Sequence, residues 1–228
     1  MLNVGRVAAR LAAGLCGLAA LAGAAVPLQA GTVSGRITLL EKGGRPAPDC
    51  SEVVVWLEGA RGRVKPTRVA VVMKGKEFRP HLVAVGVGST VEFPNDDPIF
   101  HNAFSVSGDN RFDLELYKRP KTGAFTFQHP GVVRVYCNIH PQMSAVVVVR
   151  DNPWFSRANS DGSFALDAVP AGRYVLKAWH ERGGEAVTEL SVPAEGAATA
   201  ELTLDGSRFK RTPHKNKFGK DYAGGEPY

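Results

Sequence analysis

The stretch Cys137-Asn-Ile-His140-Pro-Gln-Met143 places a thiol, an imidazole and a thioether within seven residues. It lies between two strand-like runs, 131–136 and 144–149, so we expect it to form the turn that joins two strands. Successive side chains of a strand point to opposite faces, and this alternation turns Cys137 toward the same side as the apolar residues before it. The thiolate is therefore expected at the closed end of a β-sandwich, away from water.

These side chains are most of a known donor set. Two imidazoles, a thiolate and a weak axial thioether form a blue-copper electron-transfer site. The second imidazole is missing from the stretch, and its best candidate is His101 in Pro94-Asn-Asp-Asp-Pro-Ile-Phe-His101-Asn102, some 36 residues upstream. A second interpretation of the same residues is a buried structural cysteine beside a surface histidine and a core methionine.

The two motifs together resemble the cupredoxin family, with the short ligand loop of its amicyanin-like members. The resemblance covers residues 67–150. It implies a Greek-key β-sandwich with one type 1 copper ion, and it implies that Asn102 helps to tie the two ligand loops together. The copper ligands that the resemblance implies are His101, Cys137, His140 and Met143.

The position of His140 suggests the route by which electrons would pass from the copper site to a partner protein. The residue lies between Ile139 and Pro141, so the edge of its ring is expected to surface in an apolar patch. Transient electron-transfer encounters use small interfaces. Ile139 and Pro141 are therefore the predicted docking residues for an unidentified redox partner protein.

The predicted function is an exported electron carrier and not an enzyme. A cysteine and a histidine three residues apart lack the separate base that a cysteine hydrolase needs, so no catalytic residues are assigned. Two other classes are compatible with the sequence. One is a module that stores, delivers or senses copper, and the other is a β-sandwich assembly protein in which the copper domain is only a scaffold.

The amino terminus predicts export to the periplasm. Arg6 and Arg10 precede an uncharged apolar run over 11–26, and small residues follow as far as Ala30. This is the pattern of a secretory signal peptide, here assigned to residues 1–30. Contact with a membrane is expected only if this segment is retained.

The positive charge of the chain is concentrated in its tail. The formal net charge is +6 over 228 residues. Residues 206–228 hold six basic and two acidic side chains, whereas residues 31–205 are formally neutral. The global charge therefore gives no reason to expect nucleic-acid binding. The tail is rich in charge, glycine and proline, and we expect it to be loosely ordered.

The rest of the sequence predicts an all-β protein with two sandwiches. Short β-rich runs alternate with Gly, Pro, Asn and Asp clusters, and no sustained helical period follows the leader. Residues 160–179 resemble the later part of a carboxypeptidase regulatory-like (transthyretin-like) sandwich, whose usual opening strand appears instead at residues 31–37. We therefore expect residues 31–62 to join 151–205 in one sandwich, with the copper domain inserted. The alternative is that 31–60 adds strands to the copper domain.

Three further side chains receive structural interpretations. Cys50 is expected to be buried and inert, without a disulfide to Cys137. Asp96 and Asp97 are interpreted as turn formers on the approach to His101, and His81 as a surface residue.

Overall fold

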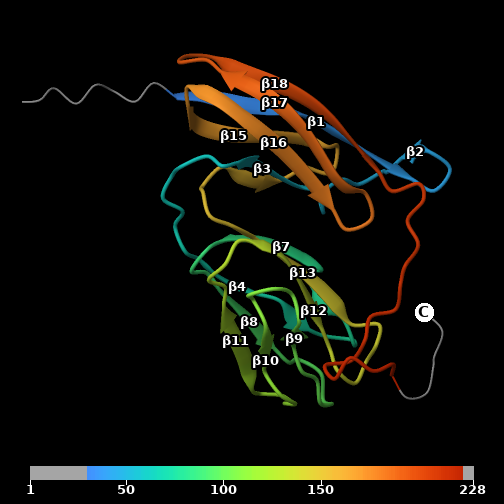
Figure 1. Ribbon diagram of the computed structural model, residues 1–228. Coiled ribbons are helices and arrows are strands. Elements are labelled where there is room, and N and C mark those ends of the chain that lie inside the picture. Colours follow the sequence, from blue (N-terminus) through green and yellow to red (C-terminus); the bar gives the residue numbers. More distant parts are fainter. Residues whose placement is uncertain (1–29, 223–228) are drawn as a thin grey trace, which may run out of the picture.

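The computed structural model describes residues 30–222 and shows two β-sandwiches, one stacked on the other (Figure 1). Every regular element of the described residues is a strand, which confirms the predicted all-β class. Over the same range there is no helix of the length and apolarity that a membrane span requires. The predicted signal peptide lies, apart from Ala30, outside the described residues.

The flanking sandwich is built from both ends of the chain. One of its sheets has the order β15-β1-β18, with β2 on an edge, and the other has the order β14-β3-β16-β17. Its strands are β1 (Ala30–Glu41), β2 (Arg45–Pro46), β3 (Val54–Glu58), β14 (Phe155–Arg157), β15 (Ser163–Pro170), β16 (Gly172–His180), β17 (Gly184–Val192) and β18 (Ala197–Asp205). Strand β1 runs antiparallel to β15 and parallel to β18, and β3 pairs with β14 and β16. The early strands thus pair with the late ones, and within the described residues none of them pairs with a strand of 67–150.

The inserted sandwich lies between these flanks in the sequence. One sheet has the order β10-β9-β12-β13-β7, the other has the order β11-β8-β4, and β5 pairs with β6. Its strands are β4 (Arg68–Ala70), β5 (Val72–Met73), β6 (Phe78–Arg79), β7 (Leu82–Gly86), β8 (Thr90–Pro94), β9 (Phe104–Ser105), β10 (Phe112–Asp113), β11 (Thr122–Thr126), β12 (Gly131–Tyr136) and β13 (Ser144–Arg150).

The chain leaves and re-enters the flanking sandwich at neighbouring points. The backbone N–H of Leu57, at the end of β3, donates to the carbonyl of Trp154, just before β14, over 3.0 Å. The Asn152 side chain donates to the carbonyl of Leu57, also over 3.0 Å. An insertion requires this closeness, because the host sandwich must close as if the inserted residues were a loop.

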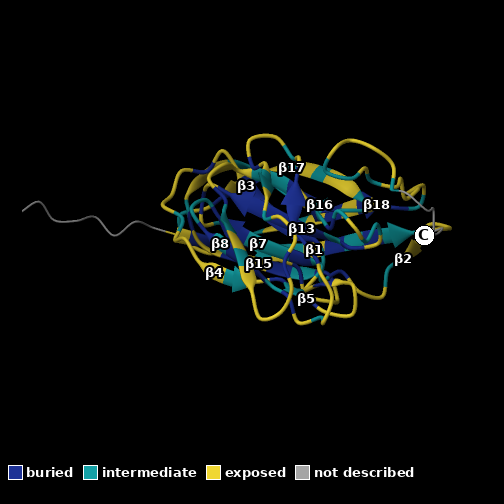
Figure 2. Ribbon diagram, turned by 90° about the horizontal axis from the view of Figure 1, so that it is seen from below, coloured by how far each residue is buried: buried dark blue, intermediate teal, exposed yellow. Residues whose placement is uncertain are grey.

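A shared apolar layer joins the two sandwiches. Val146 and Val148 of β13 lie in one buried cluster with Val54 and Trp56 of β3. The alternate residues of β13 pack into the core of the inserted sandwich. Strand β13 is thus buried on both faces, which explains its almost continuous apolar run. The burial colouring of Figure 2 shows β3 and β13 in dark blue between yellow loops.

His81, whose side chain is 30% exposed, also joins the two sandwiches. Its Nδ1 lies 3.0 Å from the carbonyl oxygen of Ser144, and its Nε2 lies 2.8 Å from a carboxylate oxygen of Glu181 in the flanking sandwich. Both partners are acceptors, so both ring nitrogens carry protons in this arrangement. The hydrogen bond to Glu181 raises the pKa of His81 against the opposing effect of burial.

Regular strand is short on either side of the segment that follows His101. Within 99–107 only β9 forms, and within 112–117 only β10 forms. Around His101 the chain instead makes an isolated bridge to Tyr117, and Glu115 adopts a positive φ of 55°, which a strand cannot accommodate. Loss of regular strand at these points leaves a loop that carries His101.

Candidate metal centre

Cys137 stands at the end of β12, on the predicted turn. Its N–H donates to the carbonyl of Met143 over 3.2 Å, and the N–H of Met143 donates to the carbonyl of His140 over 3.0 Å. These two bonds close the turn between β12 and β13. The Cys137 side chain is completely buried in the core of the inserted sandwich.

His101 reaches the same place from the loop between β8 and β9. Its backbone exchanges two hydrogen bonds with Tyr117, of 3.0 and 2.8 Å. The Tyr117 hydroxyl donates in turn to the carbonyl of Phe93, on β8, over 2.6 Å. The bridge fixes the backbone of His101, and its side chain is fully buried.

Three donor atoms converge at this end of the sandwich. The Cys137 Sγ lies 3.9 Å from His101 Nδ1 and 3.7 Å from His140 Nδ1. The two Nδ1 atoms are 3.0 Å apart. Atoms that each bind one ion over about 2.0–2.3 Å must lie within about 4.6 Å of one another. All three separations meet this condition, so the donors fit a single metal ion.

Asp97 sets the orientation of the His101 ring, a role that its assignment as a turn former missed. Its carboxylate lies 2.8 Å from His101 Nε2 and also accepts from the backbone N–H groups of Gly75 and Lys76. A carboxylate can only accept, so Nε2 carries the proton and Nδ1 presents its lone pair to the centre. Burial opposes ionisation of Asp97, yet these three donors lower its pKa to about 2. The sequence offered only a weak signal, an acidic side chain four residues before a histidine.

Local electrostatics favour the neutral forms of the other two donors. Burial raises the pKa of Cys137, against the opposing effect of the backbone amides of Asn102, Ile139 and His140. Burial also lowers the pKa of His140. The imidazole is thereby ready to donate a lone pair, whereas the thiol must lose its proton on binding a metal.

The remaining predicted site residues lie on the two loops that carry these donors. Met143 is completely buried in the same core cluster as Cys137. The Asn102 side chain accepts from the N–H of Asn138 over 2.7 Å and so connects the two donor loops. Ile139 is 42% exposed, and Pro141 is partly buried.

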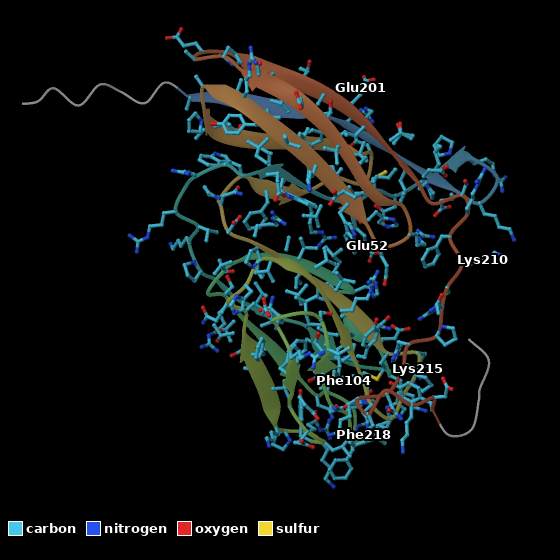
Figure 3. All side chains as sticks on the ribbon, in the orientation of Figure 1. Glu52, Phe104, Glu201, Lys210, Lys215 and Phe218 are labelled. Carbon is cyan, nitrogen blue, oxygen red and sulfur yellow. The ribbon has the colours of Figure 1, made fainter. Side chains whose placement is uncertain are left out.

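Part of the tail lies against this site, because residues 214–222 contact the loop of Cys137. In Figure 3 it descends from the flanking sandwich past Lys210, and Lys215 and Phe218 lie beside the inserted sandwich. Its Tyr222 hydroxyl donates to the carbonyl of Cys137 over 2.8 Å. His214 Nε2 donates to the carbonyl of Pro141 over 2.7 Å.

Comparison with known proteins finds similarity in part of the chain. Copper-containing nitrite reductase from Thermus scotoductus SA-01 is 30% identical over 41% of this chain and 24% of its own, with a TM-score of 0.36. The Cu(I) form of an amicyanin mutant is 20% identical over 42% of this chain and 98% of its own, with a TM-score of 0.34. A purple cupredoxin from Nitrosopumilus maritimus is 19% identical over 50% of this chain and 98% of its own, with a TM-score of 0.30. This chain spans about a quarter of the nitrite reductase. No family model and no curated protein matches the sequence.

Proposed function

We propose that this chain is an exported type 1 copper protein that carries electrons between partner proteins. The observation that supports the proposal is the triangle of His101 Nδ1, His140 Nδ1 and Cys137 Sγ, in which His101 and Cys137 are buried and His140 is half-buried. In this proposal those three side chains would hold the ion, and the buried thioether of Met143 would be a further, weak donor. Softness of the thiolate and thioether favours copper over the harder divalent metals. Copper would supply a one-electron couple, cycling between Cu(I) and Cu(II).

The protein's own groups would keep the site constant during that cycle. Asp97 holds the ring of His101 in one tautomer, and Asn102 joins the loop of His101 to that of Cys137. Burial of Cys137 and His101 excludes water from the donors. A metal site whose ligand side chains are fixed by hydrogen bonds to neighbouring residues changes little in geometry between oxidation states. Electron transfer requires that this change in geometry be small.

Electrons would leave through the exposed side of the donor loop. Ile139 and Pro141 flank His140, and Ile139 is 42% exposed. Ile99, Phe100 and Leu116 near His101 are exposed apolar residues as well, at 38%, 49% and 48%. We propose that a redox partner docks on the apolar residues next to His140. The predicted signal peptide supports a periplasmic location for this exchange.

A copper-delivery or storage module is the second candidate function. The flanking sandwich favours it, because a simple electron shuttle has no need of a second domain. We propose that this sandwich is of the carboxypeptidase regulatory-like kind, with its opening strand in β1 and its later strands in β15 and β16. Two measurements separate these functions. An electron carrier gives a reversible one-electron wave in voltammetry. A storage site gives no such wave and releases its copper to a chelator.

The proposal is tested by the visible spectrum of the purified protein after addition of Cu(II). A thiolate-to-copper absorption band is expected, and Cys137→Ser should abolish it. Cys50→Ser is the matched control, because Cys50 is also buried but lies in the core of the flanking sandwich. A wild-type protein without the band, or a band that survives Cys137→Ser, would refute the assignment.

A further inference from the structure

The tail makes contacts with the donor loop that the proposed function does not account for. The segment 214–222 touches the loop at three residues. Tyr222 donates to the Cys137 carbonyl, His214 donates to the Pro141 carbonyl, and the N–H of Lys217 donates to the Asn138 side chain over 2.9 Å. Three contacts with a seven-residue turn that also bears the metal donors make the tail a direct neighbour of the site.

A closed ring of hydrogen bonds passes through Lys217. Asn138 N–H donates to the Asn102 Oδ1 over 2.7 Å, and Asn102 Nδ2 donates to Asp113 over 3.2 Å. Lys217 Nζ donates to the other carboxylate oxygen of Asp113 over 2.6 Å, and its backbone N–H returns to Asn138. Each of the four residues contacts two others. The ring therefore joins the His101 loop, strand β10, the Cys137 loop and the tail.

Aromatic packing holds the other half of the segment. The ring of His214 stacks on Tyr136 at 3.9 Å between centroids and an angle of 20°. Tyr222 packs edge-on against His214 at 5.2 Å. Tyr136 is the last residue of β12 and immediately precedes Cys137. The stack thus attaches the tail to the strand that positions the thiolate.

The geometry points to residues 214–222 as a third component of the metal centre, with Lys217 and Tyr222 as positioning residues for the donor loop. This inference rests on the proposed function, since positioning matters only if the loop holds a metal. The tail covers the backbone carbonyls of Cys137 and Pro141, while Ile139 stays exposed. It therefore restrains the loop at these two carbonyls and leaves the side chain of Ile139 exposed.

The test compares full-length variants within the same tail. Lys217→Met combined with Tyr222→Phe removes the side-chain contacts to Asp113, Glu115 and Cys137. Lys215→Met is the matched control, because Lys215 pairs with Asp221 and both side chains are largely exposed, at 56% and 83%. Exposed pairs of this kind contribute little to stability.

The first measurement needs no metal. Amide hydrogen exchange of the loop 137–143 in the copper-free protein is expected to be about tenfold faster in the double variant, the factor that corresponds to roughly 1.4 kcal/mol. The control should exchange at the wild-type rate. Exchange that is unchanged in the double variant would overturn the inference. An equal increase in the exchange rate of the β16 amides would also overturn the inference. Such an increase would report global unfolding and not a local release of the loop.

The second measurement follows transfer of Cu(I) to a chromogenic chelator. The double variant is expected to release copper about tenfold faster than the control. Equal release rates in variants that show the thiolate-to-copper band would overturn the tail inference and leave the proposed function standing. Absence of the band in the wild-type protein would instead refute the proposed function.

Discussion

The contact between Asp97 and His101 leads to the sharpest prediction. Asp97→Ala removes an acceptor shared by three donors, Gly75 N–H, Lys76 N–H and His101 Nε2–H, at 2.8, 2.9 and 2.8 Å. The two backbone donors belong to exposed residues, and water can replace the carboxylate there. The His101 side chain is fully buried, so its Nε2–H loses its partner without a substitute.

The expected loss follows from that difference. Leaving one buried donor unsatisfied costs about 1–3 kcal/mol. Freed from Asp97, the ring can also adopt the tautomer in which Nδ1 carries the proton and cannot bind a metal. Removal of a partner of this kind lowers metal affinity about 10- to 100-fold. Asp97→Asn keeps a neutral acceptor at the same place and should lose less.

Competition with a Cu(I) chelator at neutral pH measures this affinity. The control is Asp96→Ala, which removes the neighbouring carboxylate, an exposed one. A nitrogen NMR spectrum of the His101 ring in the copper-free protein reports the tautomer independently. The reasoning fails if Asp97→Ala binds copper as tightly as Asp96→Ala, or if its His101 ring keeps the proton on Nε2 alone.

Two further predictions concern the axial position and the contact between the sandwiches. Met143→Leu should retain copper and raise the reduction potential, because loss of a weak donor disfavours Cu(II) more than Cu(I). The potential should rise by roughly 60 mV for each tenfold loss of affinity for Cu(II) relative to Cu(I). A voltammogram that shows no rise contradicts this prediction. His81→Gln should lower the melting temperature more at pH 5.5 than at pH 8.5. The hydrogen bond to Glu181 raises the pKa of His81 against the opposing effect of burial, and the charge of Glu52 adds to the rise. The contact therefore stabilises the wild-type protein fully below the ordinary histidine pKa of 6.5. This stabilisation is lost as the pH rises through the pKa of His81 in the folded state. Arg134 lies 3.9 Å from Glu181 on the same contact. A pH-independent difference would show that His81 is not the titrating group.

Sequence alone determined the features that depend on near neighbours in the chain. Alternating apolar residues and turn formers are local, so the all-β class followed from them. Cys137, His140 and Met143 lie on one short turn, and their spacing alone kept them close. The nesting also left a local trace, because an opening strand stood at residues 31–37 and none stood before residue 155.

Tertiary structure decided the contacts that join distant segments. The segment 214–222 reaches the donor loop through contacts that span 79 and 85 residues. These contacts are made by polar and aromatic groups in a charged, glycine-rich segment. Such a segment has no hydrophobic periodicity from which the contacts could be predicted, and its composition predicted loose order. The role of Asp97 was equally ambiguous, because the same local sequence is compatible with a turn-forming aspartate and with a hydrogen-bond partner of His101. Only the folded backbone, which brings residues 75, 76 and 101 around one carboxylate, distinguishes the two.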